Sequence, residues 1–435
     1  MKHLRVISQM SGYNALERTV GAALTRFPRI KSTVETVYQR TAYRCFGDPD
    51  FEYELHTSAS MRSAATWGHV DRRRNQFVGF YDVCPWNATM QAYVVHEYPG
   101  GANAADIVVI RDGSASSVGQ TEAWNYQQGS RLQWHPVREA ELVFNDVVDR
   151  SLVTRVVDVE EGADHMIDHP VQAVNPNGGA FLSIDYRRLQ RNSPGYGYGT
   201  VDPAALLDPQ ADGITRVGFD GSTELLVSLA ELRSLAASGV PHSHHYLHHL
   251  RYSPDGEHFA FLHRWIDGTR RRTQLFVADR SGRLSLHSED QYLSHFCWLD
   301  QERLFLYGSI STDGRGYYIL DVSTGSARYV SDLDGFGDGH PSLSPDGRWI
   351  VTDTYPNRLR RRSLWLYDLE TGNRILLGQF HAPFQFDGVM RCDLHPRWSP
   401  DGRFVSIDSA HSGERGSYII DVSSITGCPT SSSSV

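Results

Sequence analysis

Alternating apolar and polar positions near the end of the chain predict short antiparallel strands. Residues 404–408 place Phe, Ser and Asp on one side and Val and Ile on the other, as in a strand with one buried face. A strand over about 393–398 precedes them, and a tight Pro-Asp-Gly turn joins the two. After a loop, residues 417–422 predict a third strand.

The same pattern recurs upstream, where Ser-Pro-Asp-Gly marks each copy at 253–256, 344–347 and 399–402. In the copy that begins near residue 339, residues 374–378 add a fourth strand after a turn. A repeat of about 45 to 55 residues with four antiparallel strands is typical of a propeller blade. The sequence therefore predicts an all-β fold, a seven-bladed β-propeller with a short helical N-terminal extension.

The innermost strands of seven blades can be counted along the chain. They are expected near 66–70, 131–136, 171–174, 249–252, 295–298, 340–343 and 395–398. The last blade runs out of chain after its third strand, so we expect residues 51–56 to complete it and close the ring. The propeller is then expected over 51–425. It follows a helical extension at 1–50, amphipathic over about 14–42 and broken near Pro28, and precedes a flexible Ser-rich tail at 426–435.

The composition agrees with a globular β protein and limits the kinds of partner that the protein is expected to bind. Apolar residues make up 40% of the chain, enough for a substantial core, and 38 glycines supply turn positions. The net charge of −9 argues against nucleic acid or an anionic membrane as a partner. Five scattered cysteines argue against a zinc ribbon or a disulfide framework. The sequence shows no signal-peptide pattern and no apolar run of membrane-spanning length, so we expect a cytoplasmic protein.

The candidate chemistry lies in histidines that share one position of the repeat. His249, His340 and His395 each stand four residues before the serine of a Ser-Pro-Asp-Gly turn. A degenerate copy places His295 at the same offset from Leu299. Because the chain has only 20 histidines, four in register favour a shared functional site over a separate structural role for each. Around a propeller axis these rings would meet, and a ring of imidazoles suits a divalent metal or proton transfer.

Basic and aromatic residues are concentrated in loops that we expect on the same face as these histidines. The inner strand starts on that face and the second strand returns to it, so the loops after the second strands share it. They carry His263 and Arg264 in blade four, Tyr355 in blade six and His411 in blade seven. Blade three has a long insertion over about 186–214. Since the planar guanidinium group binds carboxylates, these arginines suggest an anionic small ligand rather than merely solvated loops.

The second half of the chain resembles the oligogalacturonate lyases, the seven-bladed propellers of polysaccharide lyase family 22. The likeness covers roughly residues 240–425 and rests on the histidine-containing stretches at 249–256, 260–263, 295–298, 340–343 and 395–398. The resemblance implies that His249 serves as the catalytic base. It also implies that His295 and His395 bind a manganese ion that holds the substrate carboxylate.

Two positions of the implied metal site differ from the family. Where the family has a glutamine and a further histidine, this sequence has Met390 and Asp393. Asp393 offers an oxygen ligand, which favours a hard cation, Mn²⁺ or alternatively Ca²⁺, whereas Met390 is not a natural ligand for such ions. The first half of the chain shows no match. The sugar is therefore expected to differ, within a broader group of propeller lyases that act on uronate-containing glycans.

These residues suit β-elimination on an acidic oligosaccharide. The proton at C5 of a uronate is weakly acidic because a carboxylate lies next to it, and a cation or an arginine stabilises the enolate-like intermediate. A histidine can remove that proton near neutral pH. We therefore assign the base to His249, proton donation to His263 or Tyr355, metal binding to His295, Asp393 and His395, and substrate binding to Arg264, His340, Arg391 and His411.

Two other functions remain open from the residues alone. A glycoside hydrolase needs two carboxyl groups, and Asp353 and Asp408 stand at matching strand ends of adjacent blades, although both also suit structural roles. A propeller that only binds glycan or protein is the non-enzymatic alternative.

Overall fold

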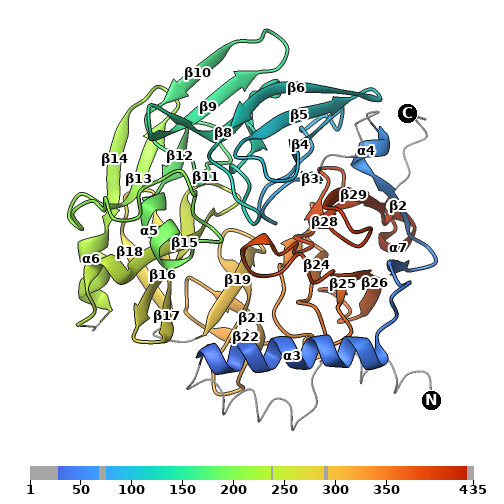
Figure 1. The fold of residues 1–435 in the computed structure, drawn as a ribbon. Coiled ribbons are helices and arrows are strands. Elements are labelled where there is room, and N and C mark those ends of the chain that lie inside the picture. Colours follow the sequence, from blue (N-terminus) through green and yellow to red (C-terminus); the bar gives the residue numbers. More distant parts are fainter. Residues whose placement is uncertain (1–27, 68–74, 237–238, 289–291, 429–435) are drawn as a thin grey trace.

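The computed structural model describes residues 28–67, 75–236, 239–288 and 292–428. They form seven antiparallel sheets arranged radially around one axis, which confirms the predicted seven-bladed propeller (Figure 1). In each blade the first strand lies innermost and the chain moves outward. None of the helices in these ranges combines the length and apolar character needed to cross a membrane.

The first four blades contain four consecutive strands each. Blade one comprises β3 (Asn75–Phe77), β4 (Ala92–Tyr98), β5 (Ala105–Arg111) and β6 (Ser114–Thr121), and blade two β7 (Gln133–Trp134), β8 (Glu141–Val148), β9 (Ser151–Asp158) and β10 (Asp164–Ile167). Blade three comprises β11 (Ala173–Val174), β12 (Ala180–Ser183), β13 (Gly213–Gly218) and β14 (Thr223–Ser228), and blade four β15 (His245–Tyr252), β16 (His258–Asp267), β17 (Arg270–Asp279) and β18 (Leu284–Ser288).

The last three blades include two strands from the start of the chain. Blade five comprises β19 (Leu293–Trp298), β20 (Arg303–Gly308), β21 (Gly316–Asp321) and β22 (Ala327–Tyr329). Blade six comprises β23 (Ser342–Leu343), β24 (Trp349–Asp353), β25 (Arg361–Asp368), β26 (Arg374–His381) and the added β1 (Tyr53–Leu55). Blade seven comprises β27 (Arg397–Trp398), β28 (Phe404–Ser409), β29 (Gly416–Asp421) and the added β2 (Ser60–Ser63).

Ring closure uses a different strand from the predicted one. Residues 51–56 were expected to complete the last blade, but Tyr53 pairs with Phe380 on the outer edge of blade six. The next strand, β2, pairs with β29 and completes blade seven, with Met61 opposite Ile420. Blade seven supplies three strands of its own, so its edge at β29 is open to a fourth. The segment before blade one therefore adds one strand to each of two neighbouring blades, β1 to blade six and β2 to blade seven.

The innermost strand of blade one also lies later than predicted. Of the expected range 66–70, residues 66 and 67 belong to the short helix α4 (Ala64–Trp67), and the others lie outside the described residues. The inner strand is β3. This blade lacks the Ser-Pro-Asp-Gly turn by which the later inner strands could be aligned.

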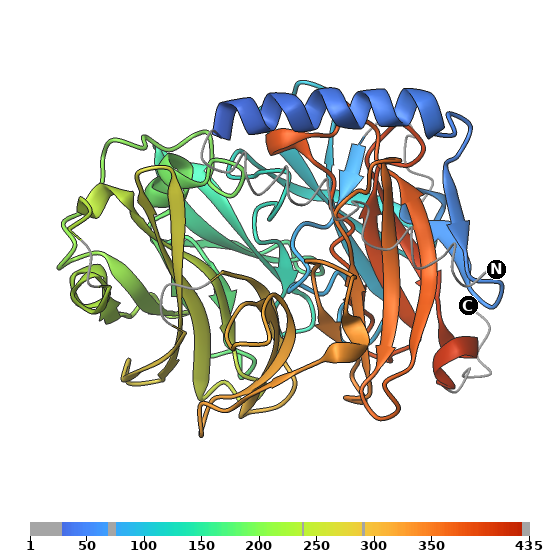
Figure 2. The ribbon, with the colours of Figure 1, turned by 90° about the horizontal axis from the view of Figure 1, so that it is seen from below.

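Helices lie at the ends and connections of the sheets. The long helix α3 (Pro28–Phe46) covers part of one face of the propeller (Figure 2), where its Gln39 accepts a hydrogen bond from Arg360. It begins at Pro28, where a break was expected, and the predicted helix before it lies outside the described residues. The other helices are α5 (Tyr186–Asn192), α6 (Leu229–Leu235), α7 (Ser423–Thr426), η2 (His242–His244), η3 (Ser331–Leu333) and η4 (Gly388–Met390).

The Ser-Pro-Asp-Gly turns end the inner strands by the same hydrogen bonds in each copy. In blade four the Ser253 hydroxyl donates to the Asp255 carboxylate at 2.6 Å, and Gly256 donates its backbone N–H to the Ser253 carbonyl at 2.9 Å. Gly256 has a φ of +72°, a left-handed conformation that glycine adopts without a steric penalty. The aspartate is thus a turn residue, and the turn fixes where the inner strand stops.

The hydrophobic core lies between neighbouring blades. One cluster joins Leu262 and Val277 of blade four to Leu304 and Leu306 of blade five. A tryptophan at the end of an inner strand adds a hydrogen bond between the same two blades. The Trp298 indole N–H of blade five donates to the Arg251 carbonyl of blade four at 3.2 Å. Apolar side chains on both faces of each blade therefore hold the ring together.

The contact between the last and first blades depends on the buried carboxylate of Asp408. It accepts backbone N–H groups from Val78 at 2.9 Å and Gly79 at 3.1 Å, and it pairs with buried Arg397 at 2.8 Å. Asp408→Ala would leave the guanidinium group and both N–H groups without these partners. We expect it to lower the free energy of unfolding by about 3–5 kcal/mol in urea denaturation.

Asp421→Asn is the matched control for Asp408→Ala. Asp421 is only half-buried in its pair with Arg403, so we expect a loss of about 1 kcal/mol or less. Equal losses for the two variants would contradict the closing role of Asp408.

Candidate functional site

The four in-register histidines meet at the axis of the propeller. The ring centroids of His249 and His295 lie 5.1 Å apart, those of His295 and His340 4.2 Å, and those of His340 and His395 4.4 Å. All four side chains are buried, with 1–2% of their surface exposed. Four blades thus contribute one imidazole each to a single cluster.

Local backbone distortions aim these side chains at the axis. His249 and His395 have φ angles of +54° and +43°, a conformation that is unfavourable for residues with a Cβ. In β15 the pairing register also shifts between His248 and Arg251, which marks a β-bulge. Successive residues of a regular strand point to opposite faces, but here the His248 ring lies 4.0 Å from that of His249. Strained backbone that the fold holds in place is frequent at functional sites.

Hydrogen bonds at Nδ1 orient three of the imidazoles. Nδ1 of His295 lies 3.0 Å from an Asp338 oxygen, and Nδ1 of His340 lies 2.8 Å from an Asp353 oxygen. Nδ1 of His395 lies 2.8 Å from a backbone carbonyl oxygen. Because these carboxylates and this carbonyl accept, each Nδ1 carries a proton, and Nε2 is the ring nitrogen left for another partner.

Two aromatic residues that follow β3 pack against the histidines at the axis. The Phe80 ring centroid lies 5.2 Å from that of His249 and 5.1 Å from that of His395. Tyr81 lies 5.4 Å from His340, and its hydroxyl donates to a blade-five carbonyl at 3.0 Å. The sequence did not predict this contact, because nothing in the apolar run around residues 77–81 marks it as axial.

The Asp393 carboxylate lies beside the histidines between two arginines. Arg362 Nη1 is 2.8 Å from its Oδ1, and Arg391 Nε is 2.6 Å from its Oδ2. His395 Nε2 is 3.9 Å from the same Oδ2. Burial alone would raise the pKa of Asp393, but the two guanidinium groups outweigh it and hold that pKa well below its usual value. The carboxylate is therefore ionised.

His340, Asp393 and His395 form the group best placed to hold a metal ion. Their donor atoms all lie within 4.8 Å of one another, and neither histidine Nε2 has a hydrogen-bond partner in the described chain. Two imidazoles with anchored Nδ1 atoms and one carboxylate fit a divalent ion. His295, which was predicted as a ligand, lies beside this group but outside it, while His340, predicted to bind substrate, is part of it.

The predicted residues Arg264, Arg391 and Tyr355 border the cluster. Arg264 is buried, and its Nη2 donates to the carbonyl of Leu293 at 3.1 Å, two residues before His295. The Tyr355 ring lies 5.8 Å from that of His340 and is 37% exposed, so it marks the solvent side of the cluster.

The insertion in blade three supplies a residue that the sequence did not single out. Its Tyr196 accepts a hydrogen bond from Arg391 Nη2 at 2.7 Å, and its ring lies 4.4 Å from that of His248. The sequence did offer a signal for Tyr196, because it stands between two glycines in a long insertion, and long ordered loops are often functional.

His263 and His411 do not reach the axial cluster, so their predicted roles are not supported. His263 lies within blade four, where its Nε2 is 3.0 Å from His245 Nδ1 and its Nδ1 is 3.2 Å from an oxygen of Gln274. The alternation of β16 turns this ring to the opposite face from Arg264. The His411 ring packs 4.9 Å from that of Tyr53, which belongs to the outer strand of blade six.

The carboxyl groups proposed for a hydrolase are both engaged in structural contacts. Asp353 accepts from the backbone N–H and the ring of His340, both at 2.8 Å, and from the backbone N–H of His395 at 3.3 Å. Asp408 closes the ring. Both accept several hydrogen bonds from the protein itself, so these carboxyl groups serve structural roles.

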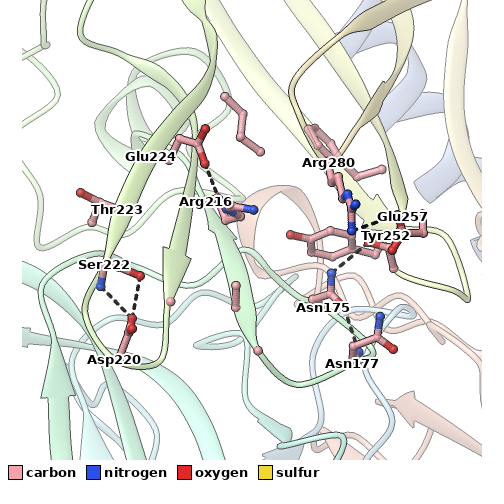
Figure 3. A pocket seen from close by; sticks show the side chains of 16 residues that line it. Asn175, Asn177, Arg216, Asp220, Ser222, Thr223, Glu224, Tyr252, Glu257 and Arg280 are labelled. Atoms are coloured by element: carbon pink, nitrogen blue, oxygen red, sulfur yellow. Dashed lines mark hydrogen bonds and ion pairs between the residues drawn. The ribbon is translucent and has the colours of Figure 1, made fainter.

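A pocket away from the axis lies between blades three and four, near the Ser-Pro-Asp-Gly turn of blade four. This pocket of about 680 Å³ has polar walls (Figure 3), but its ionic groups already pair with one another. Arg216 contacts Glu224, and Arg280 Nη1 is 3.5 Å from Glu257. The pocket therefore lacks the unpartnered polar atoms that distinguish the axial cluster.

Comparison with known sequences yields a short match only. No family model matches the chain. The chain is similar to the Tol-Pal system protein TolB of Francisella tularensis, with 24% identity over 196 residues. That similarity covers 36% of this chain and 45% of the TolB chain, so it spans less than half of either protein.

Comparison with solved structures extends over the whole propeller. The chain is similar to oligogalacturonate lyase from Vibrio parahaemolyticus, with a TM-score of 0.59, 14% identity, and coverage of 86% of this chain and 98% of the lyase. An oligogalacturonate lyase in complex with manganese gives a TM-score of 0.61, 13% identity, and coverage of 85% and 96%. The expected resemblance to these lyases is thus confirmed for the fold.

The buried histidines predict that acid destabilises the protein. Burial lowers the pKa of His295 to about 4, and it holds the pKa values of His248, His249 and His395 well below the usual 6.5. In the unfolded chain these rings take up protons near their usual pKa of about 6.5, so the unfolded state binds more protons below that pH. Stability that is present above pH 6.5 is therefore lost as the pH falls.

Urea unfolding of the chelator-treated protein at about pH 7.5 and about pH 5.5 measures this effect. We expect a smaller free energy of unfolding at the lower pH. His248→Gln removes one titrating ring and should reduce the difference. Equal stability at the two pH values would show that the rings are not held neutral.

Proposed function

We propose that the protein is a lyase that cleaves a uronate-containing oligosaccharide by β-elimination, with His249 as the base. The observation that carries the proposal is the position of His249. Its two ring nitrogens are buried without partners in the described chain, and its ring belongs to the same cluster as His340 and His395. Buried polar atoms without partners in a folded protein point to a bound ligand, water or ion.

The reaction needs a base and a positive site at a fixed separation, and the cluster offers both. Burial and the neighbouring His248 ring hold the pKa of His249 well below 6.5, so this imidazole is neutral and able to accept the C5 proton at neutral pH. The His295 ring lies between that of His249 and that of His340, and His340 belongs to the same group of donor atoms as Asp393. A uronate with its carboxylate at that end would present its C5 proton toward His249.

A divalent metal fits the His340, Asp393 and His395 group. Mn²⁺ is favoured over Ca²⁺ because two of the three donors are imidazole nitrogens, which calcium rarely takes as ligands. When bound, such an ion neutralises the substrate carboxylate and stabilises the negative charge that develops once the C5 proton leaves. Oligogalacturonate lyase, a protein of the same fold, is known in complex with manganese.

The arginines around the cluster suit the acidic substrate. Arg391 is held by Asp393 and Tyr196, and it remains partly exposed, with 24% of its side chain open to solvent. It can therefore meet a carboxylate at the entrance to the site. Arg264 lines the opposite side, and Tyr355 stands at the entrance.

A propeller that only binds a partner is the second candidate. The TolB similarity supports it, since TolB is named as a component of the Tol-Pal system, although that similarity covers 36% of this chain.

For the cellular compartment, we propose the cytoplasm. Its support is that Cys45, Cys84, Cys297, Cys392 and Cys428 are all free thiols.

The lyase proposal predicts an unsaturated product. Incubation with a panel of uronate oligosaccharides should raise the ultraviolet absorbance of a C4=C5 double bond conjugated to the carboxylate. His249→Gln should lower this rate by about 10²–10⁴-fold, the range for loss of a general base. The matched control is His287→Gln, a histidine on the outermost strand of blade four, which should retain the rate.

The three classes of function give different outcomes in this assay. A hydrolase would release reducing sugar without the absorbance change, and a binding propeller would do neither. Either result with every oligosaccharide of the panel would refute the lyase proposal.

The metal proposal predicts one Mn²⁺ site per chain. Titration calorimetry on chelator-treated protein should show it, and Asp393→Asn or His340→Gln should weaken binding by at least about tenfold. His295→Gln should change the affinity less, because His295 lies outside the donor group. If His295→Gln weakened Mn²⁺ binding more than His340→Gln did, the ligand set predicted from the sequence would be the correct one. If no Mn²⁺ bound, the metal proposal would fail.

A further inference from the structure

His248 and His249 form a pair of imidazoles with no protein partners for any of their four ring nitrogens. Both side chains are buried, at 1% and 2% exposed, and Nδ1 and Nε2 of each ring lack a hydrogen bond in the described chain. The ring centroids are 4.0 Å apart with an interplanar angle of 30°. A buried polar group without a hydrogen bond destabilises the folded protein, so a purely structural role does not explain two such rings.

A second buried histidine pair in the same blade shows what a structural arrangement looks like. Nδ1 of His245 lies 3.0 Å from Nε2 of His263, whose Nδ1 is in turn 3.2 Å from the side-chain oxygen of Gln274. Three of those four nitrogens therefore have partners. The contrast indicates that the nitrogens of His248 and His249 are kept for a ligand.

The backbone is distorted to bring these two rings together. Regular pairing of β15 would turn His248 and His249 to opposite faces of the blade. The register shift after His248 and the φ of +54° at His249 instead set the rings side by side. A bulge that redirects a side chain beside an active site is a recurring use of this feature.

Two imidazoles at this distance cannot easily both carry a proton. The positive charge of one ring opposes protonation of the other, and burial keeps both rings neutral in the protein without a ligand. Arg264, Arg271, Arg391 and His295 also face His248 and oppose its protonation. A bound anionic sugar supplies the negative charge that favours one proton on the pair. One ring is then an acid while its neighbour remains a base.

We propose that His248 is the catalytic acid that protonates the leaving group, opposite His249 as the base. This inference rests on the proposed lyase function. It takes the role for which the sequence suggested His263 or Tyr355. The structure places His263 inside blade four, and the Tyr355 ring lies 5.8 Å from that of His340, at the other end of the row of rings from His248. The Tyr196 ring, 4.4 Å from that of His248, forms a side of the same subsite.

The proton balance of the step is closed within the pair. Neutral His249 takes the proton from C5, and the electrons of the C5–H bond form the C4=C5 double bond. The C4–O bond breaks, and its oxygen takes the proton that His248 carries. The products are an unsaturated uronate and an alcohol. The pair still holds one proton, now on His249, and exchange with solvent returns it to His248.

The test compares two leaving groups at C4 of the same uronate. One is the natural sugar alcohol, which needs a proton to depart, and the other is a nitrophenol, which does not. His248→Gln should lose about 10²–10⁴-fold in kcat with the sugar leaving group and stay within a few-fold of the unmodified protein with nitrophenol. His249→Gln should lose activity with both, and His287→Gln with neither.

Each outcome bears on a different statement. If the unmodified protein acts on neither substrate, the lyase proposal fails and this inference falls with it. If it acts on both, but His248→Gln impairs them equally or not at all, only the role of His248 is overturned. If Tyr196→Phe rather than His248→Gln shows the leaving-group dependence, the acid is Tyr196.

A measurement on the unmodified protein covers the case in which His248→Gln fails to fold. A series of substituted phenol leaving groups should give rates that depend weakly on the phenol pKa, because an acid protonates the departing oxygen. A steep dependence would show that no acid acts there and would overturn the inference.

Discussion

The site depends on one fixed spacing. Each of His249, His340 and His395 stands four residues before the serine of a Ser-Pro-Asp-Gly turn. The turn is closed by its own side-chain and backbone hydrogen bonds, so it sets where the inner strand ends. Counting back from that point places His249, His340 and His395 at equivalent radial positions, and the propeller symmetry carries these positions to the axis. A shift of one residue in any inner strand would turn its imidazole into the packing between blades.

The axial cluster concentrates polar groups where a protein interior normally excludes them. Their cost is limited because burial keeps the rings of His249, His295 and His395 neutral. In addition, Asp338 and Asp353 each contact an imidazole Nδ1, and Asp393 lies between two guanidinium groups. Within the cluster, ring nitrogens of His248, His249, His340 and His395 have no hydrogen-bond partner among the described residues. In His340 and His395 a hydrogen bond at Nδ1 fixes the ring and leaves Nε2 without a protein partner, whereas His248 and His249 have neither nitrogen bonded.

The same architecture serves proteins of different kinds, so the fold alone does not decide the function. Oligogalacturonate lyases share the propeller over most of both chains at 13–14% identity, and part of this sequence is similar to TolB. The distinction has to come from the axial residues. The lyase proposal rests on these residues, which combine imidazoles with unpartnered nitrogens, an ionised carboxylate and adjacent guanidinium groups.

Local patterns along the chain were enough to predict the architecture and the four histidines that meet at the axis. Turn motifs and alternation are local properties, so the repeat of four strands, the seven blades and the histidine register could be read without coordinates. The tertiary structure alone decided which strands close blades six and seven, that Phe80 packs at the axis, and that His340 rather than His295 joins Asp393. It also decided that His263 faces away while His248 turns inward. These outcomes depend on bulges, positive φ angles and contacts between distant segments, and none of these follows from the local order of apolar and polar residues.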